Sequence, residues 1–453
     1  MSHRSALFVA AALASLVPAC MQGDLPPAEG PEADACPVVT NATPTLHAST
    51  ITRNETWTAA ASPHVVQWET SLAENVALTI EPCARVVFRR DAALNATRAG
   101  ARLVAEGTAR RPITFAGDAG ARWGTVGVSH PARATLRYVR LSGGGGDRFH
   151  RHGTLSLRGD SATPAQPVAL LDHVTVEDSL GPGVVVERTA TFAPGSTDLT
   201  VTRAGTGGVV PFAVWINEHA IDGLPSGRYT GNAVDEILVD PSGANGTGGL
   251  QEDATMRDRG VPYRIGSSSV DRFNIGAGGR NAPRQTTLTV EAGVVMRFTP
   301  GTRMNVELYT GDFPASGALR ALGTAERPIV MTSAAERPRP GDWSGLWYGG
   351  VPAASNRLEH VSLEFTGYDC SCVLSTCSAI ERHDAAVILT AQPSTAFIRN
   401  VRFANGHGHG VFRGWVGAAS PDFTESNTFD AMGGCPQTLP ASPTGCTPRV
   451  ACR

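Results

Sequence analysis

The sequence contains no lysine, and all 38 of its basic residues are arginines. Charged residues make up 17% of the chain, below the quarter usual for soluble proteins, and aromatic residues only 6%. The absence of lysine excludes every mechanism that uses a lysine amine as a base or Schiff-base partner. The net charge of −3 argues against a nucleic-acid partner, because proteins that bind phosphate backbones carry excess positive charge.

Long hydrophobic runs are also lacking. No segment reaches the roughly 18 consecutive apolar residues of a transmembrane helix. The apolar run at residues 6–17 follows His3 and Arg4 and is typical of a signal peptide. We therefore predict a signal peptide over residues 1–19.

The end of this run, Val17-Pro-Ala-Cys20, resembles the lipobox of bacterial lipoproteins, although proline is unusual at position 18. The resemblance implies lipidation of Cys20 and a membrane partner reached through the lipid. It also implies a location in the bacterial cell envelope, at the outer membrane, facing the periplasm or the exterior. The alternative is ordinary cleavage near Ala19, with Cys20 as an incidental thiol.

The segment after Cys20 has little that could order it. Residues 21–35 are rich in proline, glycine and acidic side chains, so they cannot bury much apolar surface. We predict that residues 20–49 comprise the lipidated cysteine and a flexible tether.

Two stretches of the chain read nearly alike. Residues 103–115 (LVAEGTARRPITF) return as residues 319–331 (LRALGTAERPIVM), with eight of thirteen positions identical. Four further pairs of matching segments accompany them, and the offset between partners rises steadily from 210 to 227 residues. This pattern predicts an internal duplication, with copy one at about residues 56–216 and copy two at about residues 256–434.

Short apolar runs bounded by Gly, Pro, Asp or Asn follow one another across residues 76–430, without helical periodicity. Equivalent runs recur about every 20 to 25 residues, which is the length of one solenoid coil. We therefore predict an all-β solenoid over residues 50–434. Gly107 and Gly323 are expected at corners that require a positive φ. Six residues should share one interior: Ile80, Ile113, Val139, Val290, Ile329 and Val361.

The motifs of both halves resemble those of secreted bacterial right-handed parallel β-helix proteins. The resemblance covers roughly residues 50–434 and depends on residues 56–66, 78–82, 107–115 and 123–124, and again on 261–265, 288–293 and 323–331. It implies a right-handed parallel β-helix built from two duplicated halves. One position departs from the family pattern: Cys83 stands where the family has glycine, whereas the second half keeps Gly293. A cysteine there suggests a disulfide, and Cys36 is the nearby partner.

Eight cysteines remain after Cys20, an even number in an exported chain, so we expect disulfides. A metal clip at Cys370, Cys372 and Cys377 is the alternative. Connectivity among the last six stays open. Residues 435–453 are predicted to form a Cys-rich tail that is stapled over the last coils. The disulfide candidates are Cys36, Cys83, Cys370, Cys372, Cys377, Cys435, Cys446 and Cys452.

Residues 213–219 (AVWINEH) resemble a strand of pectate lyases, but Asn217 replaces the family's aspartate and His219 is displaced by one position. The family's Arg-x-Pro-x-x-Arg motif is missing. Trp215 is more simply a core residue. Asp172 and His173 should point to opposite faces of a strand, which argues against a shared acid–base site. His383 and Asp384 are expected to face solvent on the solenoid wall. His150 with His152 and His407 with His409 are expected to be loop histidines, and a weak transition-metal site is the alternative.

We therefore expect no catalytic residues, no metal and no cofactor. The predicted function is that of a non-catalytic, monomeric envelope lipoprotein whose β-helix binds a polysaccharide or a surface protein. The alternative is a polysaccharide lyase or glycoside hydrolase of the same fold, because a fold alone does not decide activity.

Overall fold

The computed structural model describes residues 35–37, 43–146, 153–160, 165–242, 248–276, 285–306, 316–369, 384–440 and 452. The chain divides into two compact units, Met1–Ala35 and Cys36–Arg453, and all the described strands lie in the second. Several residues singled out above lie outside the described residues: Cys20, His150, His152, Cys370, Cys372, Cys377, His383 and Cys446.

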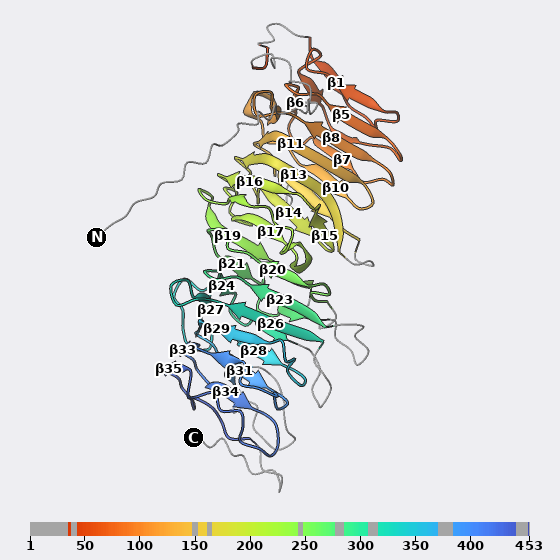
Figure 1. The fold of residues 1–453 in the computed structure, drawn as a ribbon. Helices are drawn as coiled ribbons and strands as arrows, with labels where there is room; N and C mark the ends of the chain where they lie inside the picture. Colours follow the sequence, from red (N-terminus) through yellow and green to blue (C-terminus); the bar gives the residue numbers. More distant parts are fainter. Residues whose placement is uncertain are drawn as a thin grey trace, which may run out of the picture. The chain divides into compact units, whose positions relative to one another are not determined.

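The described residues form an all-β structure, as predicted. Two single-turn 3₁₀ segments, η1 (Asp118–Gly120) and η2 (Glu218–Ala220), are the exceptions among them. All pairings between the described strands are parallel, and the strands stack in chain order (Figure 1). In-register parallel sheets of this kind are consistent with a right-handed parallel β-helix.

Two large sheets carry most of the strands. The first sheet contains β1 (Thr45–His47), β2 (Glu55–Trp57), β3 (His64–Val66), β5 (Ala77–Ile80), β6 (Arg85–Phe88), β8 (Arg102–Glu106), β9 (Ile113–Gly117), β11 (Arg133–Ser142), β13 (Gln166–Glu177), β15 (Ala190–Phe192), β16 (Thr197–Thr202) and β18 (Gly227–Arg228). The second sheet contains β4 (Glu69–Ser71), β7 (Ala93–Ala96), β10 (Val126–Ser129), β12 (Leu155–Arg158), β14 (Val184–Glu187), β17 (Phe212–Ile216), β19 (Val234–Val239), β21 (Tyr263–Ile265), β24 (Val295–Phe298), β27 (Ile329–Ser333), β30 (Val361–Glu364), β33 (Arg402–Ala404) and β35 (Thr428–Asp430).

Two smaller sheets occupy the C-terminal half. The third sheet contains β20 (Ala254–Met256), β23 (Thr286–Val290), β26 (Gly317–Leu322), β29 (Arg357–Glu359) and β32 (Ile398–Arg399). The fourth sheet contains β22 (Arg272–Ile275), β25 (Arg303–Val306), β28 (Leu346–Tyr348), β31 (Ala385–Leu389) and β34 (His409–Arg413). The coil β23–β24–β25 therefore contributes one strand to each of three sheets, whereas in β5–β6–β7 the first two strands join the first sheet and the third strand joins the second.

Several coils are longer than the 20 to 25 residues expected from the sequence. Leu136 pairs with Leu171, and Met296 pairs with Met331. The extra residues lie in loops between strands, which a solenoid tolerates because only the strand positions must stay in register.

Single non-glycine residues turn the corners of some coils. Tyr138 lies inside β11 with φ of 47°, and His173 lies inside β13 with φ of 54°. Their rings stack with centroids 4.4 Å apart. The expectation that Asp172 and His173 point to opposite faces is wrong, because the left-handed conformation of His173 breaks the alternation. His173 Nδ1 lies 2.6 Å from Asp172 Oδ1.

The expectation of a positive φ at Gly107 and Gly323 is also wrong. These glycines are needed for close packing instead. A Cβ at Gly107 would lie 2.8 Å from the carbonyl oxygen of Arg111, and a Cβ at Gly323 would lie 2.3 Å from that of His360. Neither carbonyl can move away easily because both belong to the packed backbone.

One hydrophobic core runs through the coils, and it contains all six interior residues predicted from the sequence. The core holds two similar aromatic stacks. Trp123 stacks on Phe88 at 4.1 Å, and its indole N–H donates to the Ser142 carbonyl at 2.8 Å. Trp343 stacks on Phe298 at 3.9 Å and donates to the Glu364 carbonyl at 2.7 Å. Each indole buries a large apolar surface while its N–H stays satisfied.

Near residue 220, the strands of successive coils begin to pair in different sheets. The first sheet ends at β18, whereas the third sheet begins at β20 and the fourth at β22. The second sheet runs unbroken through this region by way of β17, β19 and β21. Phe88 and Phe298, which occupy matching sequence positions, therefore lie in different sheets.

Both ends of the coiled region are tied down. Cys36 forms a disulfide with Cys83, whose φ of 69° is that of a corner glycine. The predicted tether over residues 20–49 is too long, because β1 already begins at Thr45 and pairs with β3. At the other end, residues 435–438 run along β34 through three backbone hydrogen bonds of 2.9 to 3.0 Å, and Cys435 bonds to Cys452. The tail thus covers the edge of the last strand in the fourth sheet. Within the described residues, no helix has the length and apolarity needed to cross a membrane.

Candidate functional site

The first sheet ends at β18, and the third sheet begins at β20. A cleft of about 600 Å³ lies there, and we call it the junction cleft. Three segments line most of it: the end of β15 and the following turn, the loop after β17, and β20 with its flanking residues. Its lining residues include Phe192, Ser196, His219, Asp222, Leu224, Ser226, Leu250, Glu252, Asp253, Arg257 and Arg259.

Asn217 holds η2 in place, and η2 carries His219 into the junction cleft. Its amide Nδ2 donates to the carbonyls of Val186 and Ala190 at 3.1 and 2.9 Å, which ties β17 to the neighbouring coil. Its Oδ1 accepts from the backbone N–H of His219 at 2.8 Å and so caps η2. The Asn217 side chain is buried, and both its amide nitrogen and its amide oxygen form hydrogen bonds. Its role is therefore to turn the chain and position His219.

Glu218 and His219 follow in η2 and have different surroundings. The buried Glu218 carboxylate accepts from the Ser242 backbone N–H at 3.0 Å and from the Ser242 hydroxyl. The His219 side chain is only 7% exposed, yet it lines the cleft. Among the described residues, its Nδ1 has no hydrogen-bond partner.

Two arginines from the residues after β20, Arg257 and Arg259, line the cleft. Arg257 Nη1 donates to Asp222 Oδ1 at 3.2 Å, and Asp222 also accepts from the Thr255 backbone N–H at 3.0 Å. Arg259 Nη2 donates to the Leu224 carbonyl. The Arg259 Nε is buried without a partner in the part of the chain that the structure describes.

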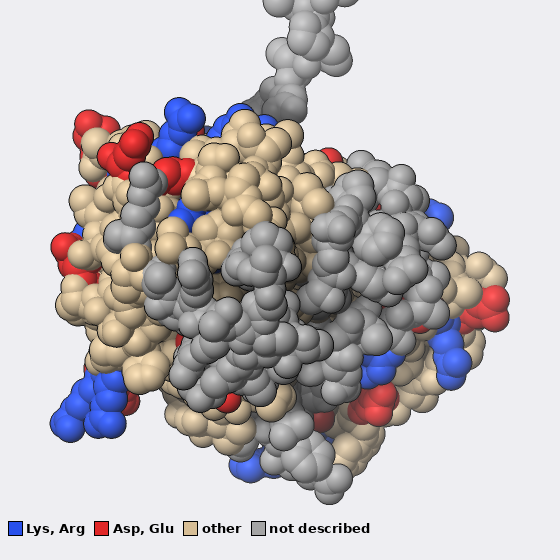
Figure 2. Space-filling model, turned by 90° about the horizontal axis from the view of Figure 1, so that it is seen from below, with Lys and Arg blue, Asp and Glu red and all other residues tan. Residues whose placement is uncertain are grey.

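The cleft therefore combines carboxylates, guanidinium groups and an imidazole with apolar contacts from Phe192, Leu224 and Leu250. Small-molecule sites commonly pair a few placed polar groups with such apolar walls. On the face seen in Figure 2, the described acidic and basic residues are interspersed rather than gathered into a patch of one sign.

A second pocket, of about 240 Å³, lies beside β17. Trp215, Glu187, Arg158 and Asp240 are among its lining residues. Burial raises the pKa of Asp240, and the negative charges of Asp271 and Glu218 raise it further, against the hydrogen bond from the Ser267 hydroxyl. The expectation that Trp215 is a core residue is wrong: only its neighbour Ile216 belongs to the core, and Trp215 faces this pocket.

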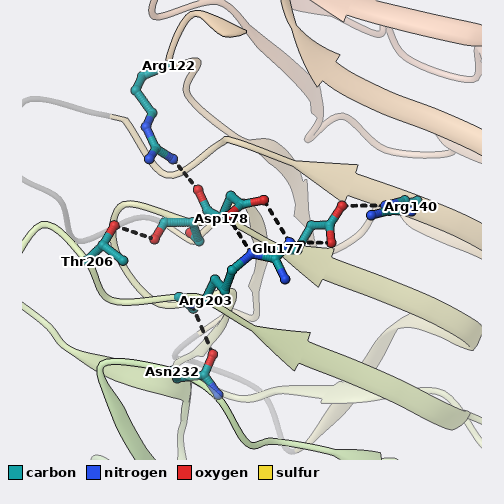
Figure 3. Close-up of polar contacts among 9 residues, drawn as sticks. Arg122, Arg140, Glu177, Asp178, Arg203, Thr206 and Asn232 are labelled. Carbon is teal, nitrogen blue, oxygen red and sulfur yellow. Dashed lines mark hydrogen bonds and ion pairs between the residues drawn. The ribbon is translucent and has the colours of Figure 1, made fainter.

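A third polar cluster joins successive corners of the first sheet (Figure 3). Arg203 donates to both carboxylate oxygens of Asp178 at 2.7 and 2.9 Å and to Glu177 at 2.6 Å. Arg140 also pairs with Glu177, and Arg122 donates to the Asp178 carbonyl. Every charged group of the cluster has a partner, so the arrangement is that of a structural ion network.

The histidines near the C-terminus fall in two places. His407 lines a cleft of about 530 Å³ together with Asp384 and Tyr368. His409 is buried, and its Nδ1 accepts from the backbone N–H of Cys435 at 2.8 Å. The expectation of a loop position is wrong for His409, which begins β34, and the expectation of a solvent-facing Asp384 is wrong because this side chain is buried. In the described part of the chain, no group of three metal-ligating side chains is gathered.

The sequence pointed to His219 but not to Asp222, Arg257 or Arg259. No motif surrounds these three, because the cleft arises from a change in sheet membership that a single sequence does not display. The only sequence signal for them is the charged residues on either side of residues 254–256, within residues 252–259.

A model of the family described as the pectate-lyase-like beta helix domain matches residues 278–368. That segment includes the strands from β23 to β30. Comparison with curated proteins and with solved structures finds no match. Together with the stacked parallel sheets, the match supports a pectate-lyase-like β-helix domain in this chain.

Proposed function

We propose that this protein binds a glycan in the junction cleft without cleaving it. The observation that carries the proposal is the convergence of His219, Arg257 and Asp222 on one cleft with apolar walls. Sugars present hydroxyls that pair with such planar polar groups, and their C–H faces pack against apolar side chains.

We further propose that the chain is a monomeric lipoprotein of the bacterial cell envelope, held at the outer membrane by a lipid on Cys20. The lipobox-like sequence at residues 17–20 supports this anchor. The similar stacks of Trp123 and Trp343 support an origin of the β-helix by internal duplication. A surface protein remains the second class of partner for the same face.

The purified full-length mature protein should bind at least one component of a glycan array. Arg257→Ala removes a guanidinium from the junction cleft and should weaken that binding at least tenfold. Arg402→Ala is the matched control, because Arg402 also pairs with acidic residues, Glu364 and Asp430, but lies away from the cleft. Absence of binding to any glycan, or equal losses in both variants, would contradict the proposal.

The second candidate function is polysaccharide cleavage, and the match of residues 278–368 to the pectate-lyase-like family favours it. Assays for unsaturated products and for new reducing ends on acidic and neutral polysaccharides separate the two functions. Robust turnover of any polysaccharide would replace binding with catalysis.

A further inference from the structure

We propose that the junction cleft is selective for an uncharged sugar, whose hydroxyls bond to His219 and Arg259. This inference rests on the proposed function and specifies its ligand. It depends on two buried polar atoms and on the balance of charge along the cleft wall.

The first observation is that His219 Nδ1 and Arg259 Nε are both buried and lack partners among the described residues. Both side chains line the same cleft. A buried polar atom without a hydrogen bond is costly, so native structures rarely keep one unless a ligand or water completes it. Two such atoms in one cleft indicate that a polar ligand completes both.

The second observation concerns what kind of group can serve both atoms. Arg259 Nε–H can only donate, whereas His219 Nδ1 donates or accepts according to its tautomer. A hydroxyl both donates and accepts, so sugar hydroxyls satisfy either tautomer of His219 as well as Arg259. A carboxylate only accepts, so it would constrain His219 to one protonation pattern.

The third observation is the charge along the wall. Glu252 and Asp253 also line the cleft and are exposed, and Asp253 Oδ1 accepts from the Thr287 backbone N–H at 2.8 Å. These carboxylates disfavour a polyanion such as an acidic polysaccharide. Arg259 has no acidic ion-pair partner in the described part of the chain and disfavours a cationic amino sugar. An uncharged oligosaccharide avoids both penalties.

Calorimetric titration of the mature protein with three sets of oligosaccharides tests this inference. The sets are neutral gluco- and galacto-oligosaccharides, oligogalacturonates, and chitosan oligomers. We expect binding of a neutral oligomer, with the two charged sets at least tenfold weaker. His219→Ala should weaken neutral binding at least tenfold, whereas His173→Ala, at a distant corner, should leave it unchanged.

Arg259→Lys provides a second variant that keeps the charge but removes the Nε donor, and a thermal melt of each variant reports its folding. Tighter binding of either charged set, or unchanged affinity in both folded cleft variants, overturns the selectivity and leaves glycan binding intact. Absence of binding in all three sets, together with an empty glycan array, overturns the proposed function itself.

Discussion

At the scale of single residues, the coil corners depend on left-handed conformations outside glycine. Asp178 has φ of 57° and Arg203 has φ of 52°. Each costs on the order of 1 kcal/mol relative to an ordinary backbone. Their bidentate ion pair links two successive corners and offsets part of that cost. The Asp172–His173 contact could not be predicted from strand alternation, because alternation assumes an unbroken strand and His173 has a left-handed backbone conformation.

The Glu177 ion network should respond unequally to removal of its acidic and basic members. Glu177 is only 7% exposed, while Arg140 and Arg203 are 59% and 52% exposed. The double change Arg140→Ala and Arg203→Ala leaves a buried carboxylate unpaired and should lower the free energy of unfolding by about 3 kcal/mol. Glu177→Gln leaves only exposed guanidinium groups and should cost about 1 kcal/mol or less.

Urea unfolding followed by circular dichroism measures both losses. The reverse order, with Glu177→Gln the more damaging change, would show that the carboxylate stabilises the corner by contacts other than these two arginines.

At the scale of elements, the sequence predicts strands and their inward faces well. Ile113 and Ile329 were placed in the core from alternation alone, because a strand with one buried face must alternate. The sheet that each strand joins was not predictable. Pairing partners in a solenoid lie a whole coil away, and the loops between them vary in length. These distant pairings determine that the first sheet ends at β18 and the third begins at β20. They therefore also determine where the junction cleft lies.

The first coil should lose stability in acid. The rings of His47, Trp57 and His64 stack in sequence, with centroids 4.1 and 5.2 Å apart, and His47 Nε2 lies 3.1 Å from His64 Nδ1. The pKa of His47 is lowered to about 4, mainly by burial and also by a positive charge on His64, against the charge of Glu55. The unfolded chain therefore binds the proton first as pH falls.

Because the folded pKa of His47 is depressed, its contribution is complete above pH 6.5 and is lost as pH falls from 6.5 towards about 4. We expect a loss of about 1 to 2 kcal/mol, allowing for partial solvent screening. Hydrogen exchange of the β1 amides at pH 7 and pH 4.5 measures it. His47→Phe keeps a stacking ring that cannot titrate, so its β1 amides should show a smaller pH effect. An equal pH effect in the variant would assign the acid response to other groups.

At the scale of the whole molecule, the proposed lipid on Cys20 would attach the coiled unit to a membrane. Cys20→Ala should therefore move the protein from the detergent-extracted membrane fraction to the soluble fraction. Fractionation of exported protein followed by immunoblotting measures the change. Cys446→Ala is the matched cysteine control and should leave the distribution unaltered. Retention of the Cys20 variant in the membrane fraction would remove the lipoprotein proposal.

The Cys36–Cys83 disulfide has a mechanical consequence. Under the proposed lipid anchor, a pull on the residues before Cys36 would enter the described chain at Cys36, and the disulfide would pass it directly to Cys83, which lies between β5 and β6. The strands between them, from β1 to β5, lie within the covalent loop and carry none of that tension. Peeling of the first strands, the usual way in which a stacked array fails under load, is thereby prevented for as long as the bond stays oxidised.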